Sequence, residues 1–205
     1  MNDIEIINKT ESFAKSYMDK YDESHDFNHA LRVKNLAIKI AKSVNMNNSE
    51  IFEIILAALV HDINDHKYKT DILQEELLKK FFKDILKEDI ADKVVYLACN
   101  VSLSKEHSSV TKNITYNLSK QLDCIRDADR IESLGAMGLS RYYIYGIINV
   151  KSNTKTIIEN IEQRSNILMK SIKTDLGKKI SKDKYKIVRL FIDDYYNTIH
   201  NYHSY

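Results

Sequence analysis

Four residues in three separate segments of the sequence carry side chains that could bind a divalent cation. They are His29, the adjacent pair His61 and Asp62, and Asp129. Each occupies a position where the apolar spacing of its segment predicts a core residue, and a buried carboxylate or imidazole is costly unless its charge is compensated. Taken singly, a buried histidine or an aspartate at a helix end has an ordinary structural explanation. Together, two imidazoles and two carboxylates that meet at one point would form a metal site, whose cation supplies the compensating charge.

The apolar spacing predicts that these segments are helices. In residues 49–63, a helical step begins at Ile51 and continues onto His61 and Asp62. The same periodicity predicts helices over residues 26–46, 72–86, 88–99 and 117–140, and a last helix from about residue 181. The sequence contains no proline and only four glycines, fewer turn formers than a sheet protein of this size would need. We therefore expect an all-α protein.

Composition limits the classes of partner. The 205 residues fit one globular domain, and 31 basic residues against 29 acidic ones leave a net charge of only +2. No apolar run approaches the roughly 20 residues that a membrane span needs, and the first residues lack the apolar stretch of a signal peptide. Two cysteines provide neither a disulfide framework nor metal-ligand spacing. We expect a cytoplasmic protein that binds neither a nucleic-acid polymer nor a membrane; a homodimer is left open.

Three segments resemble the hallmark motifs of the HD-domain phosphohydrolase superfamily. They are HDFNHALRVKNLAIKIA (25–41), LAALVHDINDHKY (56–68) and DADRIESLGAMGLSR (127–141). The resemblance is strongest to small stand-alone bacterial-type members, a group that includes nucleotide pyrophosphohydrolases, and it covers nearly the whole chain from residue 22 onward. It implies a single compact helical bundle over residues 1–205, with a metal-site core at about 22–145 and C-terminal helices in 154–205 packed on it.

The resemblance also implies the ligands of a metal ion. The family pattern of one histidine, then His-Asp, then aspartate matches His29, His61, Asp62 and Asp129. Imidazole and carboxylate ligands without thiolate suit Mn, Fe, Co, Ni, Zn or Mg, and such an ion acidifies bound water and polarises a P–O bond under attack. We expect one divalent ion, because Asn100 stands where some relatives carry an additional histidine for a second metal.

Further residues near the motifs are candidates for catalysis and for binding phosphate. Asp65 and His66 follow the His-Asp pair by three and four residues; we favour Asp65 as a general base or water-orienting group, with a helix-end or loop residue as the alternative. The candidates for substrate binding are His25, Arg32, Lys67, Arg130 and Arg141. Their alternatives are a loop residue, a surface lysine or, for Arg130, an ion pair with Asp127 or Glu132.

The predicted function is a metal-dependent phosphohydrolase that acts on a small phosphorylated metabolite. A nucleotide is the first choice, through either nucleoside triphosphate pyrophosphohydrolase or nucleotidase activity. An alarmone-type hydrolase ranks lower, because no convincing Glu-Asp pair follows the HD motif, and the single metal weakens a cyclic-nucleotide hydrolase. A non-catalytic nucleotide-sensing HD protein is the alternative from another class, although it would have little need for all four ligands.

Overall fold

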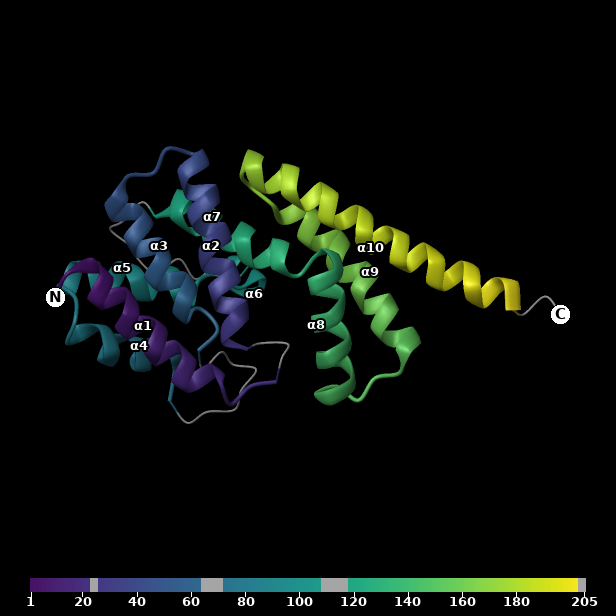
Figure 1. Ribbon diagram of the computed structural model, residues 1–205, viewed down its shortest axis with the longest axis horizontal. Coiled ribbons are helices and arrows are strands. Elements are labelled where there is room, and N and C mark those ends of the chain that lie inside the picture. Colours follow the sequence, from purple (N-terminus) through teal and green to yellow (C-terminus); the bar gives the residue numbers. More distant parts are fainter. Residues whose placement is uncertain (23–25, 64–71, 108–117, 203–205) are drawn as a thin grey trace.

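The computed structural model describes residues 1–22, 26–63, 72–107 and 118–202, and within these ranges it contains helices and no strand (Figure 1). The helices are α1 (Asp3–Met18), α2 (Phe27–Ser43), α3 (Asn48–Val60), α4 (Gln74–Lys83), α5 (Glu88–Cys99), α6 (Leu103–His107), α7 (Ser119–Glu132), α8 (Gly135–Ile148), α9 (Thr154–Ser171) and α10 (Asp175–Tyr202). The predicted all-α class is confirmed. The last helix, α10, begins at Asp175 and therefore earlier than the predicted start near residue 181.

The main hydrophobic core lies among the first five helices and α7. Helix α2 packs against both α3 and α7, and α3 also contacts α1 and α5. Val33 of α2, Leu59 of α3 and Ile125 of α7 are fully buried in this core. The apolar stripes that the sequence predicts for α2, α3 and α7 therefore face one another, and polar residues on those stripes are brought together.

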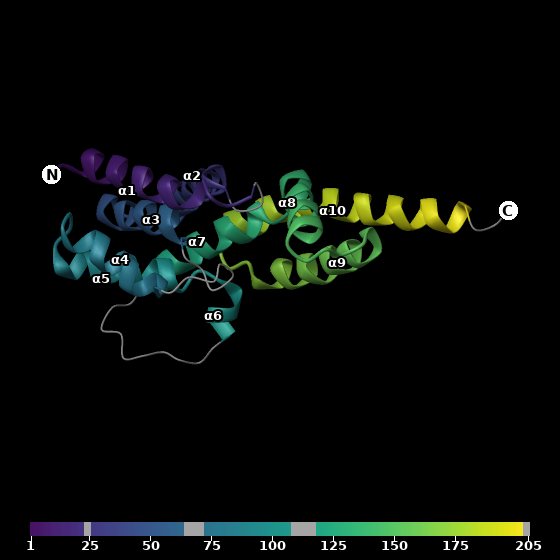
Figure 2. The same cartoon turned by 90° about the horizontal axis from the view of Figure 1, so that it is seen from below.

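A second hydrophobic cluster joins α8, α9 and α10. It contains Leu134, Ile158 and Ile192, all fully buried. Helix α7 contacts each of these three helices as well as α2 and α3, and Figure 2 shows α7 running from the N-terminal helices toward α8. The far part of α10 projects beyond α8 and α9 (Figure 1). Helix α7 thus connects the two hydrophobic clusters.

The predicted helix over residues 117–140 is two helices, and this prediction was wrong. Helix α7 ends at Glu132, and α8 begins at Gly135, whose φ of +71° lies in the left-handed region that favours glycine. A Cβ atom at Gly138 would overlap the backbone carbonyl of Ser133. Both glycines therefore serve the turn between α7 and α8.

Side-chain caps fix where the helices that carry the site begin. The Asp26 carboxylate accepts a hydrogen bond from the backbone N–H of His29 at 3.0 Å, so it caps α2 and holds His29 in the first turn. Helix α3 begins with a capping box, in which Asn47 and Glu50 each accept a hydrogen bond from the other's backbone N–H. From that start, the apolar body of α3 runs directly to His61.

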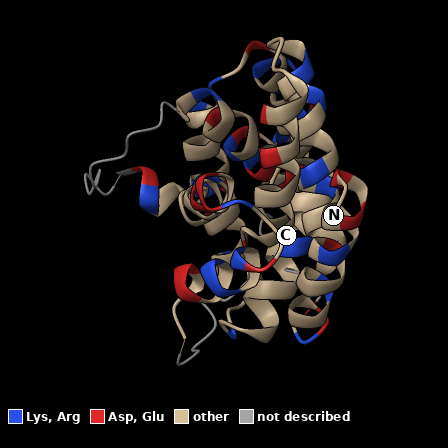
Figure 3. Ribbon diagram, turned by 90° about the vertical axis from the view of Figure 1, so that its left-hand side faces the viewer, with Lys and Arg blue, Asp and Glu red and all other residues tan. Residues whose placement is uncertain are grey.

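Charged residues of both signs are distributed over the helices. Lys and Arg segments alternate with Asp and Glu segments in the view of Figure 3, as the nearly balanced composition leads one to expect. Within the described ranges, no helix combines the length and the apolar character needed to cross a membrane.

Candidate metal centre

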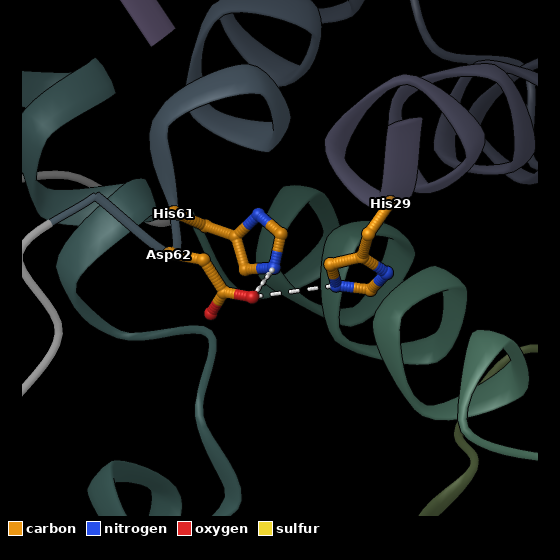
Figure 4. A group of neighbouring side chains, drawn as sticks. All are labelled: His29, His61 and Asp62. Carbon is orange, nitrogen blue, oxygen red and sulfur yellow. Dashed lines mark ion pairs between the residues drawn. The ribbon is translucent and has the colours of Figure 1, made fainter. Parts of the chain in front are cut away.

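Three of the four predicted metal ligands converge at the end of α3. His29 lies in the first turn of α2, and His61 and Asp62 directly follow α3. Each offers a ligand atom within 4.8 Å of those of the other two, and Figure 4 shows the two rings and the carboxylate turned toward one another. All three residues are buried, with exposures of 0% for His29, 6% for His61 and 8% for Asp62.

Asp129, near the end of α7, faces the same group. Its Oδ1 atom lies 3.3 Å from His29 Nε2 and 3.7 Å from His61 Nε2. The Oδ2 atom of Asp62 lies 3.4 Å and 3.5 Å from the same two nitrogen atoms. Two carboxylates from different helices therefore flank the same pair of imidazoles, and α2 brings them together because it packs against both α3 and α7.

A hydrogen bond fixes the orientation and tautomer of His61. Its Nδ1 atom lies 2.8 Å from the carbonyl oxygen of Ala58, and because a carbonyl can only accept, Nδ1 carries the hydrogen. The neutral ring then presents the lone pair of Nε2 to the two carboxylates. Among the described residues, His61 Nε2 and both ring nitrogens of His29 are buried without a hydrogen-bond partner that meets distance and angle criteria.

The charges at this cluster shift the pKa values of its members. Burial alone would lower the pKa of His61, but Asp62 and Asp129 outweigh it and raise the pKa to about 9. Burial alone would raise the pKa of Asp129, but His29 and His61 lower it well below its ordinary value. Without a cation, the two carboxylates thus retain a proton on an imidazole, which indicates that the cluster requires positive charge.

The residues present fit a divalent ion. Ligand atoms that share one ion at about 2.1 Å lie roughly 3.0–3.5 Å apart, close to the four nitrogen–oxygen separations of 3.3 to 3.7 Å. The hydrogen bond from His61 to Ala58 is the kind of outer contact that orients ligating histidines, and the buried, unpartnered nitrogens provide the lone pairs.

A cavity of about 100 Å³ opens beside the cluster. His61, Asp62 and Asp129 line it, together with Arg141 of α8 and Arg164 of α9. Cationic side chains therefore share this space with the carboxylates. The Gln74 amide, which also lines the cavity, donates a 2.6 Å hydrogen bond to the His61 carbonyl and ties the start of α4 to the end of α3.

The predicted substrate-binding residues differ in where they lie relative to the cavity. Arg141 is 9% exposed and lines the cavity, where a bound phosphate could reach it. Arg32 donates a 2.6 Å hydrogen bond to Glu132, an ion pair that joins α2 to α7. The substrate-binding candidates His25 and Lys67 lie outside the described residues, as do the catalytic candidates Asp65 and His66.

The prediction that Arg130 binds substrate does not agree with its surroundings. Its side chain is only 2% exposed and does not line the cavity. The guanidinium donates to the carbonyl of Ser171 at 2.6 Å and to the carboxylate of Glu106. Arg130 is an internal connector of α6, α7 and the end of α9. The alternative of a carboxylate pair is correct in kind, but the partner is Glu106 rather than Asp127 or Glu132.

Asp127 and Asn100 serve as structural connectors. Asp127 is fully buried and accepts hydrogen bonds from the backbone N–H groups of Lys173 and Thr174, just before α10. Asn100 donates through its side chain to the carbonyl of Tyr96 at the end of α5, and its own carbonyl accepts two hydrogen bonds from Arg126.

Sequence reasoning missed Arg164 and Lys105, which also line the cavity. Arg164 lies on the exposed side of α9 and Lys105 on the exposed side of the short helix α6. Charged residues on exposed helix faces are common, so no spacing or composition marks these two. Only the approach of α6 and α9 to the cavity identifies them.

The fold is that of the HD-superfamily hydrolases. The crystal structure of an HD-superfamily hydrolase from Bacillus thuringiensis matches with a TM-score of 0.71 and 21% identity, over 97% of this chain and 99% of that one. The crystal structure of Bacillus subtilis YpgQ matches with a TM-score of 0.76 and 20% identity, over 97% of this chain and 98% of that one. YpgQ in complex with ADP gives a TM-score of 0.73 at 19% identity. The predicted resemblance is thus confirmed for the fold.

Similarity is also detectable in sequence alone. The chain is 29% identical over 154 residues to the uncharacterized protein L803 of Acanthamoeba polyphaga mimivirus, in a match that covers 68% of this chain and 61% of the viral protein. It is 26% identical over 148 residues to YpgQ of Bacillus subtilis, in a match that covers 71% of this chain and 68% of YpgQ. The match therefore spans less than two thirds of the viral protein. No family model matches the chain.

Proposed function

We propose that this protein is a metal-dependent phosphohydrolase whose substrate is a small phosphorylated metabolite, with nucleotides as the first class to test. The convergence of His29, His61, Asp62 and Asp129 from three helical segments carries the proposal. Four protein ligands leave positions open on a six-coordinate ion for substrate oxygen and water. The shared fold with HD-superfamily hydrolases supports the reaction class, and the ADP complex of YpgQ supports the choice of nucleotides.

The residues of the chain have separate tasks in this proposal. His29, His61, Asp62 and Asp129 hold the divalent ion, and the Ala58 carbonyl keeps His61 in the tautomer that can bind it. When bound, the ion lowers the pKa of water and polarises the P–O bond that breaks. Arg141, almost fully buried at the cavity wall, binds a phosphate oxygen and offsets the negative charge of the substrate.

The test is a hydrolysis assay over a panel of nucleotides. The wild-type protein is incubated with nucleoside mono-, di- and triphosphates and with Mn²⁺, Co²⁺, Ni²⁺, Zn²⁺ or Mg²⁺, and released phosphate and pyrophosphate are measured. Asp62→Asn removes one ligand charge with little change in shape. Asp183→Asn is the matched control, because Asp183 lies on the exposed part of α10 in a surface pair with Lys186.

The proposal expects turnover that requires an added metal, with a loss of at least a hundredfold in Asp62→Asn and none in Asp183→Asn. Release of pyrophosphate from triphosphates would identify a pyrophosphohydrolase, and release of orthophosphate from monophosphates a nucleotidase. Equal rates in wild type and Asp62→Asn would contradict the proposed centre. Tight nucleotide binding without turnover under every metal would contradict the enzyme and favour a nucleotide sensor.

A further inference from the structure

The C-terminal helices bring two arginines to the cavity that the metal centre occupies. Arg141 comes from α8 and Arg164 from α9, whereas His61, Asp62 and Asp129 come from the ends of α3 and α7. The cavity is therefore formed by helices from both hydrophobic clusters of the protein. The helices of the second hydrophobic cluster thus contribute positive charge to the site.

The charge of the metal centre explains why such arginines are needed. A divalent ion held by the carboxylates of Asp62 and Asp129 is formally neutralised by them. A substrate with a chain of phosphates adds negative charge with each group, and the metal centre alone cannot balance it. Cations elsewhere in the cavity must do so, and arginine is suited to this because its planar guanidinium binds phosphate oxygens in pairs.

Arg164 differs from other arginines of the chain in its surroundings. Arg32 pairs with Glu132, Arg130 with Glu106, and Arg189 with Glu162 and Asp193. For Arg164, no carboxylate partner is found in the part of the chain that the structure describes. Its side chain is exposed and borders the cavity. The guanidinium of Arg164 can therefore bind an anionic ligand without first breaking an ion pair.

Tyr142 of α8 interacts with Arg164 of α9, which lines the cavity. Burial raises the pKa of Tyr142 to about 12, the guanidinium groups of Arg164 and Arg141 oppose the rise, and the charge of Asp129 adds to it. The phenol therefore remains protonated in the physiological range. A neutral phenol oxygen can accept a hydrogen bond from Arg164 and so limit the positions that the guanidinium takes.

We propose that Arg164, positioned by Tyr142, binds the substrate phosphates that lie beyond the one at the metal centre. The preferred substrates would then carry a chain of two or more phosphates. This inference rests on the proposed function and deepens it, because it assigns part of the substrate specificity to α9. Arg164 would affect binding of a phosphate chain, whereas the metal ligands would affect the chemical step.

Binding of inorganic tripolyphosphate, measured by titration calorimetry at one fixed Mn²⁺ concentration, tests the inference without requiring turnover. Arg164→Ala is expected to weaken binding about tenfold, the effect of losing one charge-assisted contact. Arg164→Lys should restore part of the affinity, because the charge is kept but not the paired geometry. Arg189→Ala, in the same helical group but away from the cavity, should bind like the wild type.

Kinetics provide the second measurement. In Arg164→Ala, the KM for a nucleoside triphosphate should rise about tenfold while kcat is kept and the constants for a monophosphate stay unchanged. Tyr142→Phe should raise the triphosphate KM severalfold, again without a change in kcat. A merely structural role of Tyr142 would instead lower kcat for all substrates together with the melting temperature.

The outcomes separate this inference from the proposed function. If Arg164→Ala binds tripolyphosphate as tightly as Arg189→Ala, or if the wild type does not bind it at all, the inference is wrong even where nucleotides are hydrolysed. If binding depends on Arg164 but no nucleotide is hydrolysed under any metal, the inference stands and the proposed enzymatic activity does not.

Discussion

The pairing of Arg130 with Glu106 gives a prediction about stability that also decides the role of Arg130. Its guanidinium is 2% exposed and donates to the Ser171 carbonyl at 2.6 Å and to the Glu106 carboxylate. Lys173 and Arg126 lie 3.2 and 3.7 Å from the same carboxylate. Substituting Glu106→Gln removes the only negative charge in this group of four side chains and leaves a buried cation without its counter-ion.

The expected loss follows from burial. Removing one partner of a buried ion pair typically costs about 3–5 kcal/mol. Glu106 itself is 19% exposed, and glutamine retains an oxygen that can accept a hydrogen bond, so the expected loss is about 2–3 kcal/mol. For a chain of this length, that corresponds to a fall in Tm of about 4–12 °C.

The assay is thermal and urea unfolding followed by circular dichroism. Asp183→Asn, in an exposed pair with Lys186 in which both side chains are more than 70% exposed, is the control and should change the free energy of unfolding by less than about 0.5 kcal/mol. If Glu106→Gln unfolds like this control, the buried pair does not stabilise the protein. A Glu106→Gln variant that folds normally but loses substrate binding would return Arg130 to the substrate site.

The pH dependence of the same variant has a defined sign. Burial alone would raise the pKa of Glu106, but Arg130, Lys173 and Arg126 outweigh it and lower the pKa. A carboxyl group with a lowered folded-state pKa contributes stability that is complete above the unfolded-state pKa and is lost as the pH falls through the folded-state pKa. The difference in stability between wild type and Glu106→Gln should therefore shrink in acid, and a difference that grows there would contradict the ion pair.

Three further predictions concern other residues. Because the pKa of His61 is raised from 6.5 to about 9, its protonation stabilises the metal-free protein fully below pH 6.5 and progressively less as the pH rises through 9. Urea unfolding in EDTA at several pH values measures this change. A free energy of unfolding that increases between pH 6.5 and 9 would contradict the prediction. Cys99 lines the cavity and burial raises its pKa to about 12, so a maleimide should react with it slowly, and more slowly still when nucleotide is bound. The labelling rate is measured in Cys124→Ser, in which Cys99 is the one remaining cysteine. A rate that nucleotide does not lower would place Cys99 away from the ligand. Gly177→Ala would bring a Cβ atom to 2.6 Å from Asp127 Oδ2 and should cost about 1–3 kcal/mol, whereas an unchanged Tm would show that the start of α10 can shift at no cost.

Much of the fold follows from local patterns in the sequence. The apolar spacing locates α2, α3, α4 and α5, because apolar residues recur at helical intervals in each and pack into the main core. The break between α7 and α8 could not be predicted in this way. The apolar steps continue through it, although Gly135 at the break has a φ of +71° and a Cβ atom there would lie 3.3 Å from Lys184 Cβ of α10.

Some residues of the candidate site could be predicted from the sequence, and others could not. His29, His61, Asp62 and Asp129 could be found because each interrupts an apolar stripe, and helices that bury those stripes against one another must bring the interruptions together. Arg164 interrupts nothing on its exposed helix face. The partner of Arg130 was equally hidden, because Glu106 lies 24 residues away on the short helix α6, whose position depends on tertiary contacts.

The central claim is that four side chains hold one divalent ion, and counting bound Mn²⁺ by electron paramagnetic resonance tests it most directly. The metal-stripped wild type should bind one Mn²⁺ per chain. The variants His29→Ala and Asp129→Ala, shown to be folded by circular dichroism, should each lose at least tenfold in affinity, and Asp183→Asn should match the wild type. Affinity and stoichiometry that do not change in the His29 and Asp129 variants would contradict the account.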